Sequence, residues 1–283
     1  MIKMRDKWAI MVDVTNVCEH QCTYCVKHVR HLRPDQFKSM TIPDLETAII
    51  SVRDFPGKIC FTGGEPLRHP EPERMMSMIR DLLPKDKVGL FTSSKTQHEK
   101  FRTQIDQTFG LVFVNYHDKD QQNVCLHQPT TLAVGDMVED REMQQSLIAA
   151  CWCNEMWSPI IGPTGAFFCD CAAGWDVLFG MGGGWPATKN WWDREGYVDQ
   201  MNRYCHLCGI CVPYPRQLQS ETREKITPVM LSRFESHRLR NLDNFEVISS
   251  TLSAEDIKAN LIGWEPWHNR QDRGNEGPQY ENK

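Results

Sequence analysis

Residues 8–25 read WAIMVDVTNVCEHQCTYC. The first eight of them form a short apolar run rich in β-branched residues, which predicts a strand. The chain then passes directly into Cys18, Cys22 and Cys25, which are separated by three and then two residues. A structural zinc site normally closes with four protein ligands, so a group of three thiolates leaves one position of a metal centre open. An open position on a metal is where a substrate or cofactor can bind.

The composition restricts the class of protein. The chain has 283 residues, 40 % of them hydrophobic, and a formal net charge of −5. That length allows one large domain or two smaller ones with a real core, and the charge gives no indication of nucleic-acid or membrane binding. Because no long apolar run and no signal-peptide pattern is present, we expect a soluble, cytoplasmic protein. The sequence does not indicate the oligomeric state.

The cysteines fall into two groups. Disulfides are rare in the cytoplasm, so twelve cysteines there indicate metal binding or catalysis. Seven of them lie together in the second half of the chain: Cys151, Cys153, Cys169, Cys171, Cys205, Cys208 and Cys211. Two separate groups predict two metal centres on two structural units.

Strand and helix patterns alternate along the first half of the chain. Strands are predicted at 8–15, 58–64, 87–94, 111–117 and 131–138, and helices between them at 41–55, 72–83 and 97–109. This order predicts an α/β fold with a parallel sheet, open or curved into a partial (β/α) barrel. Ligands of such sheets bind at the carboxyl ends of the strands, where the first cysteine group lies.

The first cysteine group resembles the motif of the radical S-adenosylmethionine (SAM) superfamily. In that superfamily C-x-x-x-C-x-x-C follows the first strand of a partial barrel, and an aromatic residue, here Tyr24, stands before the third Cys. The sequence GGEP at 63–66 follows the second predicted strand, as the superfamily's SAM-methionine motif does.

The resemblance implies a cofactor arrangement. Cys18, Cys22 and Cys25 would hold three irons of a [4Fe-4S] cluster, and SAM would bind the fourth. Glu65 would contact the methionyl ammonium of SAM. Glycines let the backbone approach a ligand closely, and Pro stiffens the turn. The cofactor-binding residues would then be Tyr24, Gly63, Gly64, Glu65, Pro66, Ser93 and Ser94.

The second cysteine group resembles the auxiliary-cluster domain of the same superfamily, in the single-cluster form called twitch. The full SPASM spacing is absent after Cys211. The resemblance implies a second [4Fe-4S] cluster, and Cys205 and Cys208 are its safest ligands because C-x-x-C brings two sulfurs to one metal. A zinc site with four cysteine ligands is the alternative.

The other ligands of this cluster are harder to choose. Cys151 and Cys169 are favoured, because the residues between the two cysteine pairs are predicted to form a strand hairpin. Cys153 and Cys171 are close rivals, since side chains two residues apart lie on the same face of a strand. Cys211, Cys153 and Cys171 are also candidate hydrogen donors, because a thiol near a substrate radical can return a hydrogen atom. Simple packing is the other role open to them.

The expected function follows from the resemblance. SAM would be cleaved reductively to a 5′-deoxyadenosyl radical that abstracts hydrogen, with electrons from a reductase of the flavodoxin or ferredoxin type. We expect a small substrate linked to a carbohydrate or nucleotide, and epimerisation or dehydrogenation as the outcome. The first predicted strand begins near Trp8, with no room before it for a winged peptide-recognition domain. Modification of a ribosomally made peptide is therefore the alternative, and a non-catalytic iron-sulfur protein is a weaker one.

Four segments are expected along the chain. They are the radical SAM partial barrel at 1–149, the auxiliary-cluster domain at 150–215, a helical segment at 216–262 and a mobile tail at 263–283. The last segment lacks apolar residues, which is typical of chain ends that do not pack.

Overall fold

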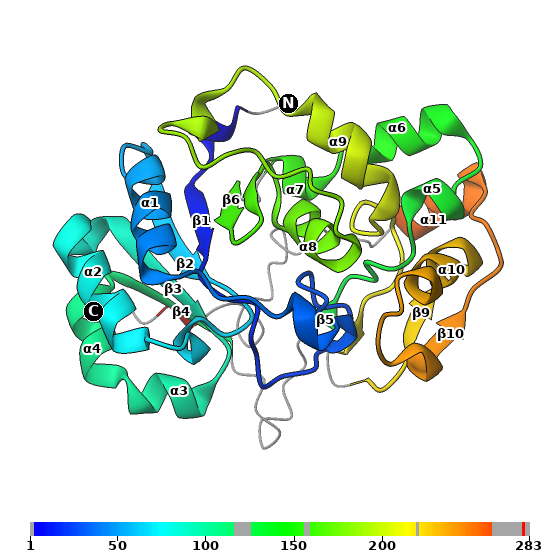
Figure 1. The fold of residues 1–283 in the computed structure, drawn as a ribbon. Coiled ribbons are helices and arrows are strands. Elements are labelled where there is room, and N and C mark those ends of the chain that lie inside the picture. Colours follow the sequence, from blue (N-terminus) through cyan, green and yellow to red (C-terminus); the bar gives the residue numbers. More distant parts are fainter. Residues whose placement is uncertain (1–2, 116–125, 156–158, 219–220, 262–278, 281–283) are drawn as a thin grey trace.

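A seven-stranded sheet organises the molecule (Figure 1). The computed structural model describes residues 3–115, 126–155, 159–218, 221–261 and 279–280. The strands of this sheet, in spatial order, are β11 (Gln279–Tyr280), β4 (Leu111–Val114), β3 (Val88–Thr92), β2 (Lys58–Thr62), β1 (Ala9–Asp13), β6 (Ile160–Gly162) and β7 (Gly165–Phe167). Strands β1 to β4 pair in parallel, and β6 runs parallel to β1. The predicted α/β class with a parallel sheet is confirmed.

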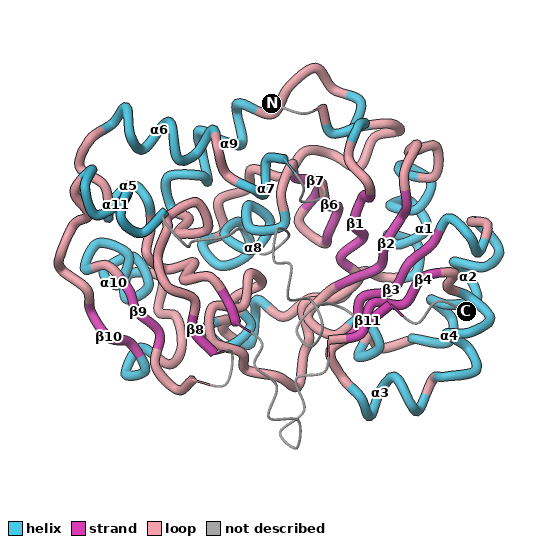
Figure 2. The backbone as a smooth tube through the Cα atoms, turned by 180° about the vertical axis from the view of Figure 1, so that it is seen from behind, coloured by secondary structure: helices cyan, strands magenta, loops and turns pink. Residues whose placement is uncertain are grey.

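Four helices follow the first strands and lie together on one side of the sheet (Figures 1 and 2). They are α1 (Ile42–Val52), α2 (Pro72–Leu82), α3 (Lys95–Lys100) and α4 (Arg102–Thr108). Helix α1 begins where the sequence predicts, because the Thr41 side chain accepts a hydrogen bond from the Asp44 amide. The helix predicted at 97–109 is interrupted at Phe101, which ends α3 and precedes α4.

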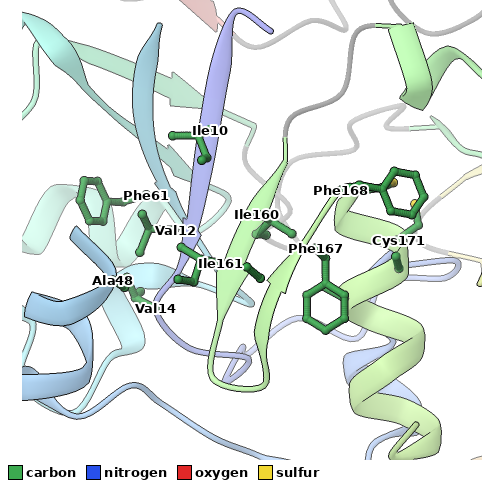
Figure 3. Close-up of a cluster of buried hydrophobic side chains, with 14 of the residues drawn as sticks. Ile10, Val12, Val14, Ala48, Phe61, Ile160, Ile161, Phe167, Phe168 and Cys171 are labelled. Carbon is green, nitrogen blue, oxygen red and sulfur yellow. The ribbon is translucent and has the colours of Figure 1, made fainter. Parts of the chain in front are cut away.

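The core lies between the sheet and these helices. Figure 3 shows Val12 and Val14 with Phe61 and Ala48, and Ile160 and Ile161 across from them on the next strand. All of these side chains are buried and belong to one apolar cluster. The strands read as continuous apolar runs because both faces of the sheet are covered.

The second half of the chain extends the same sheet. The hairpin predicted between the two cysteine pairs is confirmed as β6 and β7, which are antiparallel, and Met11 of β1 pairs with Ile160. Three helices, α7 (Trp152–Glu155), α8 (Asp170–Phe179) and α9 (Val198–Tyr204), lie beside it (Figure 1). The seven cysteines of this region are therefore carried by elements that pack against the end of the barrel sheet. The boundary proposed at 149/150 stays a prediction.

The strand predicted at 131–138 is wrong. Residues Val134–Met137 form the short helix α5, in which the Met137 amide bonds to the Ala133 carbonyl. The apolar run is buried under helix α6 (Arg141–Ala149) and α11 (Ala254–Leu261) in a small cluster of its own. A short apolar run does not distinguish a strand from a buried helix.

The C-terminal region packs on the loops that follow β1. It contains α10 (Pro228–Ser236), which lies in the predicted helical segment, and the pair β9 (Glu224–Ile226) with β10 (Phe245–Val247). Its strand β8 (Gln217–Leu218) pairs with β5 (Leu126–His127), which comes from the middle of the chain. Of the predicted tail, all but Gln279–Tyr280, which pair with β4, lies outside the described residues. Among the described helices, none has the length and apolar character needed to span a membrane.

Candidate metal and cofactor site

The three predicted motifs lie at one edge of the sheet. The first cysteine group follows β1, GGEP follows β2, and Ser93 and Ser94 follow β3, and these strands are parallel neighbours. The Gly64 amide donates to the Thr15 carbonyl at 2.6 Å, and the Glu65 amide to the Val17 carbonyl at 2.8 Å. The GGEP turn is therefore bonded directly to the residues that lead into Cys18.

The two glycines are required by this contact. A Cβ on Gly63 would lie 2.3 Å from the Thr15 carbonyl oxygen, and one on Gly64 would lie 2.6 Å from that of Val17. No side chain fits at such distances, so only glycine permits the close approach of the two loops. The sequence predicted that the glycines would make room for a ligand, and the structure gives them a second reason, contact with the cysteine loop.

Glu65 is fully buried and bonds to the end of β3. Its two oxygens accept from the Thr92 hydroxyl at 2.9 Å, from the Ser93 and Ser94 amides at 2.9 and 3.1 Å, and from the Leu67 amide at 3.2 Å. Burial raises the pKa of this carboxyl and the hydrogen bonds lower it. Burial has the larger effect, and the resulting pKa is about 7. Glu65 thus joins the second and third motifs, and contact with a SAM ammonium stays a prediction. Pro66 begins the single helical turn after Glu65.

The cysteines of the first group differ in exposure. Cys22 is buried, whereas Cys18 and Cys25 are half-buried. Burial raises the pKa of the Cys18 and Cys25 thiols above the usual range. Within the described residues, their sulfurs do not form a group as compact as the one found in the second half of the chain.

Tyr24 points toward the C-terminal region. Its backbone is left-handed, with φ of 55°, and its side chain is 2 % exposed. The hydroxyl donates to Gln217 Oε1 and accepts from the Lys225 amide, both at 2.5 Å. A contact between Tyr24 and SAM stays a prediction, and SAM would be a further partner of a side chain that already bonds to Gln217 and Lys225.

Glu224 is a buried residue of the site that the sequence analysis missed. Its carboxylate accepts from the Tyr24 amide at 3.2 Å, and lies 3.4 Å from Arg30 Nη1 and 3.1 Å from His31 Nε2. Burial raises the pKa of Glu224, but His31 and Arg30 lower it more, so the net shift is downward. Nothing in the polar stretch TREKITP distinguishes this Glu from a surface residue.

All seven cysteines of the second group line one pocket. The pocket also contacts Phe168, Trp175 and Tyr204. Three of the sulfurs, those of Cys153, Cys169 and Cys171, lie within 4.8 Å of one another and are buried. This triad could hold a metal ion or part of a cluster, and its all-thiol character favours zinc or an iron-sulfur centre.

The other cysteines lie around this triad. Cys151 and Cys205 are half-buried, as is Cys208, and Cys211 is buried. Hydrogen bonds from the Cys153 and Cys171 thiols lower the pKa of Cys169, whereas burial raises the pKa of Cys153. The three thiols of Cys153, Cys169 and Cys171 therefore form one hydrogen-bonded group.

Helix α8 packs tightly on the loop after Cys25. The imidazole of His28 lies 4.1 Å, centroid to centroid, from the ring of Trp175. Its Nε2 is buried and has no hydrogen-bond partner in the described part of the chain. Burial lowers the pKa of His28 to about 3, so the imidazole is neutral in the folded protein at ordinary pH.

Acid should therefore destabilise the protein through His28. The unfolded chain binds a proton near pH 6.5 that the folded chain does not bind above about pH 3. The contribution to stability is complete above pH 6.5 and is lost as the pH falls toward 3, at up to about 1.4 kcal/mol per pH unit. We expect His28→Phe, which keeps a ring against Trp175, to lose less stability than wild type between pH 7 and 5. Urea unfolding at both pH values tests this, and equal losses would contradict it.

Comparison with known proteins gives only a distant structural likeness. No family model and no curated protein matches the chain. The crystal structure of BtrN in complex with AdoMet and 2-DOIA is similar over 71 % of this chain and 88 % of that chain, with 15 % identity and a TM-score of 0.46. The crystal structure of SeMet BtrN in an OPEN conformation is similar over 76 % and 97 %, with 15 % identity and a TM-score of 0.40. At these values the likeness supports no statement about function.

Proposed function

We propose that the chain is a radical SAM enzyme with an auxiliary iron-sulfur centre. The observation that supports this most is the meeting of three motifs at one edge of a parallel sheet. CEHQCTYC, GGEP and TSS follow the adjacent strands β1, β2 and β3, and backbone and Glu65 hydrogen bonds join them. Each motif alone is common, but their order and contact match what the superfamily needs to bind a cluster and SAM together.

The residues take these roles in the proposal. Cys18, Cys22 and Cys25 would hold a [4Fe-4S] cluster, and Glu65 with Ser93 would lie beside SAM. When bound, the cluster and SAM would supply a 5′-deoxyadenosyl radical that abstracts hydrogen from the substrate. The chain itself contributes the backbone contact between Gly64 and Thr15, which fixes the cofactor turn against the cysteine loop.

The second cysteine group would hold the auxiliary centre. We propose Cys153, Cys169 and Cys171 as the core of its ligand set, because their sulfurs converge and are buried. Cys208 is the fourth ligand in this proposal, since a hydrogen bond joins its thiol to that of Cys171. This differs from the set that spacing favours, Cys151 and Cys169 with Cys205 and Cys208. The iron content of double cysteine variants distinguishes the two sets.

The substrate would be a small molecule linked to a carbohydrate or nucleotide, with epimerisation or dehydrogenation as the outcome. A flavodoxin or ferredoxin type of reductase would supply electrons. A hydrogen-donor role remains a proposal for Cys211, which is buried at the same pocket. It competes with ligation for Cys153 and Cys171. The division into segments 1–149, 150–215 and 216–262 is likewise proposed.

Iron content and SAM cleavage test the proposal. After anaerobic reconstitution we expect about eight irons per chain, as two four-iron clusters, and 5′-deoxyadenosine on reduction with SAM. Replacing Cys18, Cys22 and Cys25 together by Ala should leave about four irons and abolish cleavage. Cys60→Ala is the matched control, because this thiol is buried within β2 in an apolar cluster with Ala9 and Phe113, which contains no cysteine of either group. A wild-type protein with zinc in place of iron, or with no SAM cleavage, would contradict the proposal.

A further inference from the structure

A buried lysine joins the two cysteine groups. Lys27 stands two residues after Cys25, and its ammonium lies 2.6 Å from Asp13 Oδ2 at the end of β1. The same ammonium bonds to Oδ1 of Asp170, the middle residue of the CDC sequence at 169–171. All three charged side chains are buried. No other ion pair in the described residues connects the loop of the first group to the start of α8.

We propose that Lys27 is a positioning residue that holds the two cysteine groups in fixed relation, and that Asp170 adjusts the charge around the second group. This inference rests on the proposed function, because it concerns the centres that the two groups would bind. It assigns a role to residues that are not ligands.

The surrounding packing gives the lysine little freedom. A Cβ on Gly174 of α8 would lie 1.9 Å from the Val26 carbonyl oxygen, so the helix and the loop touch backbone to backbone. Two residues after Val26 and one after Gly174, the rings of His28 and Trp175 lie against each other in a tilted arrangement, with centroids 4.1 Å apart. Lys27 therefore lies in a tightly packed interface between α8 and the loop after Cys25. A change in the length or charge of its side chain should disturb both.

The charges of the Lys27 ion-pair group, which consists of Lys27, Asp13 and Asp170, are only partly balanced. Two carboxylates share one ammonium, and Asp13 Oδ1 has no hydrogen-bond partner among the described residues. Buried charges are screened weakly, so the remaining negative charge acts over several ångströms. Asp170 stands between Cys169 and Cys171 in the chain, and the sulfurs of these two cysteines belong to the compact group of the second half. The Asp170 carboxylate thus adds negative charge beside the second cysteine group.

The positioning role is tested with Lys27→Met. This variant leaves two carboxylates facing each other in the interior, and removal of one partner of a buried ion pair is strongly destabilising. We expect the reconstituted variant to lose iron from both cysteine groups, although Lys27 is not a ligand. Adding Asp170→Asn removes one of the two uncompensated carboxylates and should restore part of the iron. Lys189→Met, at an exposed ion pair, should keep the wild-type iron content.

The charge effect is tested with Asp170→Asn alone. Asn has the same shape and leaves the pair of Lys27 with Asp13 intact. Because loss of a negative charge makes electron uptake easier, the reduction potential of the second centre should rise while the iron content stays constant. The reduction potential is measured by redox titration followed by electron paramagnetic resonance. If Asp170 had a purely structural role, this potential would not change.

The outcomes separate this inference from the proposed function. A wild-type protein without iron-sulfur signals would contradict the function and the inference with it. Normal clusters in wild type, combined with full iron in Lys27→Met or an unchanged potential in Asp170→Asn, would overturn only the role of the Lys27 ion-pair group. If Lys27→Met fails to fold, the potential of Asp170→Asn decides alone.

Discussion

Replacing Cys153 and Cys171 together by Ala is expected to remove the auxiliary cluster and lower the iron content from about eight to about four per chain. The reason is geometric, because with Cys169 these two sulfurs form the compact group whose members lie within 4.8 Å of one another. The first cysteine group should be unaffected, since none of its residues lines the same pocket. Iron and sulfide analysis after reconstitution measures the effect.

The matched control is the double replacement of Cys151 and Cys205 by Ala. Both line the same pocket but are half-buried and lie outside the compact group. If the triad is the ligand core, this variant should retain about eight irons. The ligand set favoured by spacing predicts the reverse, with iron lost on replacing Cys151 and Cys205 and kept on replacing Cys153 and Cys171. Loss in both variants would contradict both assignments.

Spacing could not choose between these cysteines, for a reason visible in the fold. The rule that side chains two residues apart share a face holds for strands. Cys169 is the residue before α8 begins, and Cys171 lies in the first turn of that helix. Likewise Cys151 precedes α7 while Cys153 lies within it. In each pair, one cysteine precedes a helix and the other lies inside it. Neither the strand period nor the helix period therefore predicts which way the two side chains point.

The parallel sheet was predictable because its strands are short apolar runs covered on both faces. Strands β1, β2 and β3 all lie within the predicted ranges, each followed by a helix. The meeting of the motifs then follows from topology, since the carboxyl ends of neighbouring parallel strands lie side by side. Local pattern and simple connectivity were enough for this part of the site.

The polar contacts that hold the loops were not predictable. Lys27 and Asp170 are 143 residues apart in the chain, and His31 and Glu224 are 193 apart. A charged residue in a polar stretch is usually a surface residue, and no periodicity marks the exceptions. Such partners are specified by tertiary packing, which a single sequence does not display.

Glu224→Ala is expected to cause a large loss of folding stability. This change leaves the buried side chains of Arg30 and His31 without their shared carboxylate and removes the acceptor of the Tyr24 amide. Breaking a buried pair in this way typically costs about 3–5 kcal/mol. We expect a loss of that order in the free energy of unfolding, measured by urea denaturation. Glu246→Ala is the matched control, since this Glu lies on the neighbouring strand β10 but is exposed.

The same variant should weaken the first cysteine group selectively. Tyr24 lies between Cys22 and Cys25, and the C-terminal region holds it through its amide and its hydroxyl. Without Glu224 the loop is less ordered, so the iron bound by the first group should fall while that of the second group stays. Glu224→Gln keeps an acceptor for the Tyr24 amide and should retain more of this iron than the Ala variant. Equal iron content in Glu224→Ala and Glu246→Ala would show that the C-terminal region does not support the cysteine loop.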